Sequence, residues 1–481
     1  MALTRRQFIT RTGLATAGAF LGPGFFRNPF LRQALAANLD TSDRYFVVIF
    51  LDGGNDGLNT VVPLADGTSG GLRAAYEFAR TAGTGGLRLL APDLAATAIG
   101  SDMNSGTPLA LHPGLVGLKH LWDAGALAAV QGCGDPVSLN FLSHEFSRGV
   151  WQTANPSAAP GYTGGWVGRY LVDAGYSGSD IPSVCIRDSV APEFFQTTTS
   201  VLALDRLDNF GFPYDPDYDA DQSAKRDAFL NLYNAASGGL QPTLNYIGAG
   251  GSSTLLASES YPALSGTYNS DRAAFSQMYD NLNTGFAGDL REIAKIIYGV
   301  KNGVSNVKAR SFELSNGGYD THSDQGTNGP NDQHYQLHRT VGDAVEVFYN
   351  DLADMGVADK LCLVVWSEFA RRIGQNASGT DHGSQGPVFV IGGPTVIGSS
   401  LPGRVYGNHP NVNDAALNDD GNTMYSQAAG DPYRSTDIRD VYGTLLKHWL
   451  GVADPTPLLP VDGGDPDVNW TAPDFDLPFL A

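Results

Sequence analysis

The chain has 481 residues, enough for one large domain or two ordinary ones, and its 42% hydrophobic content allows a substantial core. Its 50 acidic residues outnumber 30 basic ones, which gives a net charge of −20. A surface this acidic repels phosphate backbones, so nucleic acid is excluded as an expected partner, and anionic substrates are disfavoured unless bound cations reverse the field locally. The odd number of cysteines argues against a disulfide framework, and their short apolar surroundings predict buried thiols at Cys133, Cys185 and Cys362.

The first 37 residues have the order of an export signal. Arg5 and Arg6 stand before a mildly apolar run that glycines and Pro23 interrupt, and small residues follow in QALAAN. A spanning helix needs about 20 strongly apolar residues, whereas a basic start, an apolar middle and a small-residue end are typical of a cleaved signal. The start TRRQFI resembles the twin-arginine signal, which exports folded proteins. We expect a signal over 1–37 and a periplasmic or secreted mature chain over 38–481 without a membrane span; the alternative is a disordered basic tail.

Behind this segment, continuous apolar runs alternate with amphipathic helical patterns. Apolar runs typical of buried strands occupy 44–54, 126–134, 181–186, 309–322 (where the strand runs into a loop), 360–369 and 386–393. Helical patterns occupy 111–127, 142–154, 275–300 and 332–356. Strands that are apolar throughout are buried on both faces, so the pattern predicts an α/β fold with helices on both sides of a mainly parallel sheet. Residues 190–265, rich in Asp, Tyr, Gly, Ser and Pro, predict an irregular insertion or cap in this single domain, and 402–436 predict another loop.

Carboxylates and histidines follow several of the predicted strands. The candidate metal ligands are Asp52, Asp56, Asp320, His322, Glu368, Asp381 and His382. Asp52 and Asp56 compete for one place. In a parallel sheet the chemistry collects past the carboxyl ends of the strands, so these side chains are expected at one edge. Oxygen and imidazole ligands without thiolates suit one or two ions of Zn²⁺, Mn²⁺ or a related divalent metal, although each cluster alone is also compatible with ordinary turn residues.

A further pair of histidines has metal-ligand spacing. His334 and His338 lie four residues apart in the predicted helix 332–356. No glutamate follows His334, so the HExxH pattern is absent. A solvated helix face is the expected place for both side chains.

Several motifs together resemble a known family. FLDGGNDGLNTVVP, SHEF, NGGYDTHSDQ, VVWSEFARR, GTDHGSQGPVFVIGG and STDIRDVYGTLLKHWLG follow one another between residues 44 and 451. They resemble the exported bacterial proteins of the uncharacterised family DUF1501, which looks like a member of the alkaline-phosphatase/sulfatase-like superfamily. The resemblance implies a three-layer α/β/α sandwich with a two-metal site of Asp and His at strand ends. One departure is Glu368–Phe369, where many of these hydrolases have Asp-His, so that one metal loses an imidazole. Cys133 lacks the C/S-x-P-x-R arrangement of a formylglycine nucleophile.

These features predict an exported, metal-dependent hydrolase of phosphate or sulfate esters, acting on a small-molecule or polymer substrate. Two cations about 4 Å apart would hold the attacking and leaving oxygens. Ser143, at the start of a helix, is the candidate nucleophile. It is equally suited to cap that helix, and water activated by the metal would then attack instead. Arg371 or Arg372 would hold ester oxygens in a bidentate pair, or else form a solvated pair on a helix face.

The alternative is a non-catalytic exported protein. It would use the same fold as a scaffold or as a binding module for a surface polymer or a partner, because a fold does not fix a function.

Overall fold

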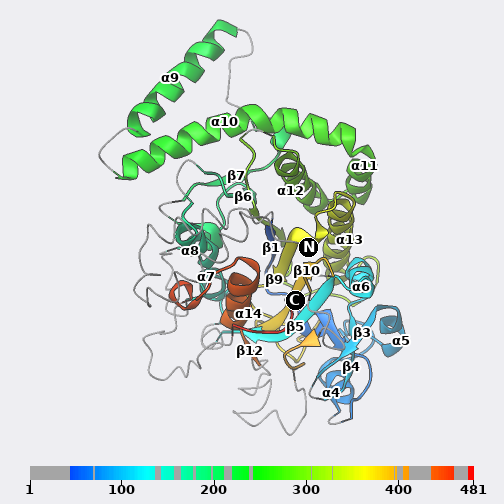
Figure 1. Ribbon diagram of the computed structural model, residues 1–481. Coiled ribbons are helices and arrows are strands. Elements are labelled where there is room, and N and C mark those ends of the chain that lie inside the picture. The colour runs from blue at the N-terminus through cyan, green and yellow to red at the C-terminus, as the bar shows by residue number, and fades with distance from the viewer. Residues whose placement is uncertain are drawn as a thin grey trace, which may run out of the picture.

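Figure 1 shows the computed structural model of the chain. The structure describes residues 44–68, 71–103, 105–135, 142–155, 164–176, 180–196, 199–210, 219–237, 242–304, 306–327, 329–394, 396–397, 405–410, 435–459 and 475–480. The signal predicted over 1–37 lies outside these residues, as does most of the loop predicted over 402–436. None of the described helices combines the length and the apolar character that a bilayer crossing requires.

A nine-stranded sheet forms the centre of the fold. Its order is β11-β5-β10-β9-β1-β8-β6-β7, and β12 pairs with β5. The strands are β1 (Tyr45–Asp52), β5 (Leu127–Gly134), β6 (Ser183–Ile186), β7 (Val201–Leu204), β8 (Ser311–Gly317), β9 (Leu361–Trp366), β10 (Gln385–Gly392), β11 (Val405–Tyr406) and β12 (Thr436–Asp437). Only β10 runs antiparallel to its neighbours β5 and β9, so among the described strands the sheet is mainly parallel, as predicted.

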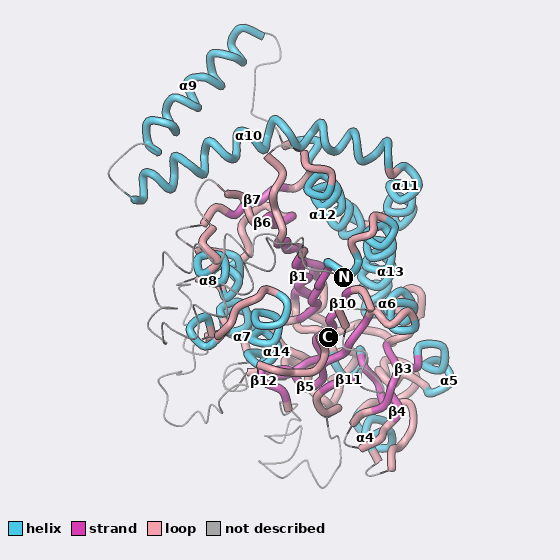
Figure 2. Tube along the Cα trace, in the orientation of Figure 1, coloured by secondary structure: helices cyan, strands magenta, loops and turns pink. Residues whose placement is uncertain are grey.

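Helices cover both faces of this sheet. Alternate residues of β1 point into two different cores, Val47 and Ile49 into one and Val48 and Phe50 into the other. Figure 2 shows α6, α12 and α13 on one side of the strands and α7, α8 and α14 on the other. Their bounds are α6 (Val116–Asp123), α7 (His144–Thr153), α8 (Trp166–Asp173), α12 (Gly285–Lys301), α13 (Gln333–Asp354) and α14 (Ile438–Thr444). The three-layer α/β/α sandwich is therefore confirmed.

The predicted burial of the cysteines is also confirmed. Cys133, Cys185 and Cys362 are free and buried, on β5, β6 and β9. Burial raises the pKa of all three thiols, so they behave as small apolar side chains of the sheet.

A small sheet was not predicted from the sequence. Its order is β2-β4-β3. Its strands and the short helices around it are α3 (Gly57–Thr60), β2 (Val61–Pro63), α4 (Leu72–Ala79), α5 (Ala91–Leu94), β3 (Ala98–Ser101) and β4 (Pro108–Leu111). It lies beside the main sheet, after the turn that follows β1 (Figure 1).

The region predicted as irregular, 190–265, is more regular than its composition indicates. It contains β7 and two long helices, α9 (Asp219–Ser237) and α10 (Pro242–Asp271), and α11 (Ala273–Leu282) follows. Figure 1 shows α9 and the start of α10 projecting from the body. One glycine of α10 serves helix packing: a Cβ on Gly251 would lie 2.1 Å from the ring of Tyr233 on α9. Glycine here permits two helices to pack closely, whereas a glycine-rich composition by itself indicates a loop.

Candidate metal centre

The ends of neighbouring strands bring most of the predicted ligands to one place. The sheet order puts β10, β9, β1 and β8 side by side. Asp52 ends β1, Asp320 and His322 follow β8, and Glu368 follows β9. Because β10 runs antiparallel to β9, the loop that precedes it, with His382, returns to the same edge. The sheet edge predicted from the sequence is therefore where these residues lie.

Three imidazole rings surround one carboxylate oxygen at this edge. Asp320 Oδ1 lies 3.4 Å from His144 Nε2 and 3.5 Å from His382 Nε2. These three residues place one ligand atom each within 4.8 Å of one another. His322 Nε2 lies 3.2 Å from Asp320 Oδ1 and 2.9 Å from His382 Nε2. We call His144, Asp320, His322 and His382 the His–Asp cluster; His144, Asp320 and His382 could each give one ligand atom to a single ion, and His322 lies against two of them.

Each ring of the His–Asp cluster is held through its other nitrogen by an oxygen acceptor. The Nδ1 contacts are His144 to Glu368 Oε1 (2.9 Å), His322 to Asp381 Oδ1 (3.1 Å) and His382 to the Leu142 carbonyl oxygen (2.7 Å). An ionised carboxylate or a carbonyl can only accept, so each Nδ1 carries a hydrogen, and in the neutral ring Nε2 is then the atom that can bind a cation. Such acceptors fix the orientation and tautomer of metal-binding histidines. The donor set suits Zn²⁺ or Mn²⁺.

The surroundings keep these groups in the protonation state that binds a cation. Burial lowers the pKa of His382, and the neighbouring histidines and Arg371 lower it further, against the hydrogen bond to Leu142. Burial raises the pKa of Asp320, but the hydrogen bond and charge of Arg371 outweigh it and leave that pKa below its usual value. Burial also raises the pKa of Asp381, but the hydrogen bond from His322 is the main cause that lowers this pKa below its usual value.

Glu368, predicted as a metal ligand, holds a ligand in position. Its buried carboxylate accepts hydrogen bonds from the Gly53 backbone N–H (3.0 Å), from Ser367 Oγ (3.0 Å) and from His144 Nδ1. Burial raises its pKa, but the hydrogen bond from His144, a backbone hydrogen bond and the charge of Arg148 outweigh burial and keep the pKa below its usual value. The ring of Phe369 packs 4.9 Å from that of His144. His144 of α7 thus adds an imidazole to this edge, where the Glu368–Phe369 sequence has none.

Two residues of α7 at this site were not among the predicted site residues. His144 and Arg148 lie four residues apart on the helix, so both face the strand ends. Arg148 Nη2 contacts Asp52 Oδ1 and lies 3.6 Å from Glu368 Oε1. The available signal was a histidine and an arginine one helical turn apart at the start of a predicted helix that follows a buried strand.

Asp56 lies in a separate ion pair. It is fully buried, and its two oxygens accept hydrogen bonds from Arg80 Nη1 (2.7 Å) and Nη2 (3.0 Å); Gln325 Nε2 adds a third (2.6 Å). Burial raises the pKa of Asp56, but the charge and hydrogen bonds of Arg80 outweigh it and lower that pKa overall. Of the two competing aspartates, the structure therefore brings Asp52 to the site and leaves Asp56 with Arg80.

The two arginines predicted to hold substrate are engaged by the protein itself. Arg371 is fully buried and donates to the carbonyls of Gly53, Gly54, Tyr319 and Thr380 and, at 2.6 Å, to Asp320 Oδ1. Arg372 is half-buried, and its Nε donates to the His382 carbonyl (3.2 Å). Neither lies on a helix, because the segment after β9 forms bridges with Asn55 and His382. Arg371 thus positions Asp320, and the predicted solvated pair on a helix face is wrong.

Ser143 occupies the N-cap position of α7, but its hydroxyl makes no capping hydrogen bond. It is half-buried and stands between two residues that touch the cluster, Leu142 and His144. Leu142 has a φ of +46°, in the left-handed region that costs a non-glycine residue energy and is common at functional sites. The geometry leaves the Ser143 hydroxyl uncommitted to the helix.

Glycines permit the close approach of the loops at this edge. Gly53 has a φ of +124°, and a Cβ there would lie 2.4 Å from the backbone nitrogen of Asp320. A Cβ on Gly54 would lie 2.0 Å from the ring of Phe369. The GG pair after β1 is therefore needed to seat two neighbouring strand-end loops against the first.

The second histidine pair is buried, which corrects the expectation of a solvated helix face. His334 and His338 are at most 1% exposed and form a buried histidine triad with His112, with ring centroids 4.2 to 5.1 Å apart. Burial lowers the pKa of all three. His338 Nε2 lies 3.1 Å from Thr60 Oγ1, so the triad packs beneath the turn after β1, apart from the His–Asp cluster.

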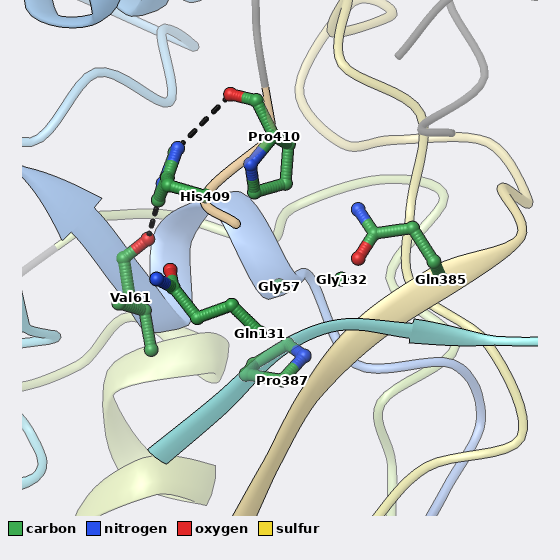
Figure 3. A pocket seen from close by; sticks show the side chains of 8 residues that line it. All are labelled: Gly57, Val61, Gln131, Gly132, Gln385, Pro387, His409 and Pro410. Carbon is green, nitrogen blue, oxygen red and sulfur yellow. Dashed lines mark hydrogen bonds between the residues drawn. The ribbon is translucent and has the colours of Figure 1, made fainter. Parts of the chain in front are cut away.

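A small cavity lies elsewhere, between β5 and β10 (Figure 3). It is lined by Gly57, Val61, Gln131, Gly132, Gln385, Pro387, His409 and Pro410. His409 is fixed by contacts to the Val61 carbonyl (3.1 Å) and the Pro410 carbonyl (3.0 Å). None of the lining residues belongs to the His–Asp cluster, so this cavity is separate from the candidate centre.

The fold and the cluster define an α/β/α protein with a candidate metal centre at the ends of its strands. Residues 301–449 match the model of a family described as "Protein of unknown function (DUF1501)". That segment carries most of the predicted ligands, and over it the resemblance seen in the sequence is confirmed. No curated protein matches the chain.

Several solved structures are similar to this chain at 11% sequence identity. The lipoteichoic acid synthase LtaP from Listeria monocytogenes is covered over 86% of its chain and 93% of this one, with a TM-score of 0.35. The PsFucS1 sulfatase from Pseudoalteromonas sp. is covered over 73% of its chain and 89% of this one (TM-score 0.29), and Ps i-CgsB in complex with k-i-k-neocarrahexaose over 71% and 84% (TM-score 0.32).

Proposed function

We propose that this protein is a metal-dependent hydrolase of phosphate or sulfate esters whose divalent ion, Zn²⁺ or Mn²⁺, is held by the His–Asp cluster. One observation supports the proposal above all: three imidazoles, each tied through Nδ1–H to an acceptor, turn their Nε2 atoms toward one carboxylate oxygen. The Nε2 atoms of His322 and His382 lie 2.9 Å apart. Two neutral rings with their hydrogens on Nδ1 would repel each other at this distance, and a bound cation would replace that repulsion by coordination.

A bound divalent ion would polarise the ester and stabilise the charge that develops on its oxygens. Residues around the cluster hold the proposed ligands in fixed orientations. Glu368 and Asp381 fix two of the imidazoles, and Arg371 fixes Asp320. The side chains of His322 and Asp320 are about half exposed, 45% and 51%, so the cluster is open to a small-molecule or polymer ester. These features support access of substrate to ligands that are already oriented.

Ser143 is the proposed nucleophile. Its hydroxyl makes no capping bond and lies at the N-terminus of α7, where the helix dipole favours a developing anion. The neighbouring residue on each side contacts the cluster, which supports Ser143 as the group that attacks an ester bound there.

We further propose export of the folded chain by the twin-arginine route. The support is the TRRQFI start with its weakly apolar run. Folded export suits a protein whose ion binds a site assembled from residues between 144 and 382, since that site exists only after folding.

The test combines metal content with hydrolysis. The mature chain, His382→Ala and the control His120→Ala, which replaces an exposed histidine on α6, are purified with added Zn²⁺ or Mn²⁺. Elemental analysis should find metal in the mature chain and the control, and loss of a ligand should weaken binding at least about 10–100-fold, the cost of losing even an outer partner. Equal metal content in His382→Ala, or none in the mature chain, would refute the proposed site.

Hydrolysis of a panel of phosphate and sulfate mono- and diesters then decides between enzyme and scaffold. Metal binding without turnover on the panel would favour the non-catalytic alternative. For an active protein, Ser143→Ala should abolish a covalent intermediate and lower turnover by orders of magnitude while metal content stays intact. Turnover within a small factor of the wild type would remove Ser143 from the proposal and favour direct attack by activated water.

A further inference from the structure

Two of the predicted metal ligands, Asp52 and Glu368, lie beside the same arginine, Arg148. Asp52 ends β1 and Glu368 follows β9, and these strands are adjacent and parallel, with Phe50 opposite Trp366. The sequence had assigned both carboxylates to a two-ion site. In the structure Arg148 Nη2 contacts Asp52 Oδ1 and lies 3.6 Å from Glu368 Oε1. The place where a second ion would bridge them is thus already occupied by positive charge.

The position of Arg148 is fixed by more than its ion pairs. Its guanidinium lies over the ring of Phe50, 5.3 Å from the centroid, and it projects from α7, whose first residue His144 belongs to the cluster. The guanidinium stays charged at any physiological pH and presents donors in a rigid planar fork. A second metal ion would therefore have to displace a cation that is held by stacking and by two carboxylates.

Glu368 is also poorly available to a metal. Its Oε1 accepts from Gly53 N–H and His144 Nδ1, and its Oε2 accepts from Ser367 Oγ. An ion on Oε1 would break the contact that orients His144 toward the first ion. A second ion could therefore use only Oε2, beside Asp52, once Arg148 is removed.

We propose that the centre takes one divalent ion per chain and that the Arg148 guanidinium stands in the position of a second. This inference rests on the proposed metal site. It assigns Arg148 the role of supplying fixed positive charge beside the ion, and it makes the cofactor mononuclear, where the sequence left one or two ions open.

Metal stoichiometry tests the inference directly. The metal-free chain is titrated with Zn²⁺ and, separately, Mn²⁺ by calorimetry, and elemental analysis follows gel filtration. The wild type should bind one ion. Arg148→Gln keeps a planar side chain without the charge, and Arg148→Ala frees the carboxylates fully; both should bind a second ion. Adding Asp52→Asn to either should restore one. The control Arg339→Ala, which removes an exposed arginine paired with Asp343 on α13, should bind one.

The outcomes separate the two proposals. No bound metal in the wild type would overturn the proposed site itself. Two ions in the wild type would overturn the mononuclear inference and leave the site standing. One ion in the wild type and still one in a folded Arg148→Gln chain, checked by circular dichroism, would show that Arg148 does not occupy a second position.

Discussion

Replacing His334 by glutamine should make the protein less sensitive to acid. His334 is fully buried in α13, its Nε2 lies 3.1 Å from Asn55 Oδ1, and its Nδ1 has no hydrogen-bond partner. Since the amide oxygen accepts, Nε2 carries the hydrogen, and an added proton would have to sit on the unpartnered Nδ1. Burial accordingly lowers the pKa of His334 from 6.5 to about 4, although the charge of Asp56 opposes the shift.

The sign and size of the effect follow from proton linkage. The unfolded chain takes up this proton below pH 6.5, but the folded chain does so only below about pH 4. The contribution to stability is therefore complete above pH 6.5 and is lost as the pH falls toward 4. At about 1.4 kcal/mol for each pKa unit, the whole loss is about 3 kcal/mol, of which about 2 kcal/mol has occurred at pH 5.

Urea unfolding at pH 7.5 and pH 5 measures this contribution. Glutamine at position 334 can still donate to Asn55, so the variant should remain folded. Its free energy of unfolding should fall about 2 kcal/mol less than that of the wild type between the two pH values. His120→Gln provides the control, since it makes the same change at an exposed histidine outside the buried triad. If His334→Gln loses as much stability as the wild type on acidification, the buried neutral state inferred for His334 is incorrect.

Two further predictions concern alkaline stability and export. Glu313 is fully buried on β8 beside Arg187, and burial, with the charge of Glu193, raises the pKa of Glu313 to about 8. The stabilising contribution of the protonated Glu313 is complete below pH 4.5 and is lost as the pH rises toward 8, so Glu313→Gln should lose less thermal stability than the wild type between pH 5 and pH 9. An equal loss in the variant and the wild type would argue against a protonated Glu313. Exchanging Arg5 and Arg6 for lysines should leave a folded precursor in the cytoplasm, which cell fractionation would detect; undiminished export would count against the twin-arginine proposal.

The architecture could be predicted because its signal is local. β1 reads as one continuous apolar run since its alternate residues enter two cores, and a strand buried on both faces has no polar positions to spare. The position of the site followed from the same reasoning, because residues placed after parallel strands must meet at one edge. Asp320, His322 and His382 were found in this way.

The roles of individual side chains could not be predicted, because their partners are remote in the chain. Asp56 and Asp52 pair with different arginines. Arg80, at the end of α4, binds Asp56, and Arg148 of α7 binds Asp52. Arg371 looked available in the sequence, yet the loops after β1 and β8 close around it. Pattern and spacing contain no information about such contacts, which arise only when the loops are packed together.

The Glu368–Phe369 departure shows why a motif compared position by position understates this site. In the sequence it removes an imidazole and so favours a protein without catalytic metal. In the structure His144 of α7 lies in the cluster. Glu368 accepts a hydrogen bond from His144 Nδ1 and thereby fixes the tautomer of that ring. Phe369 then fills the space beside the rings, 4.9 Å from His144 and 4.8 Å from His382. If the cluster binds a metal as proposed, an imidazole of α7 and the carboxylate of Glu368 have exchanged the roles of ligand and support, so the donor chemistry would be kept although the motif differs.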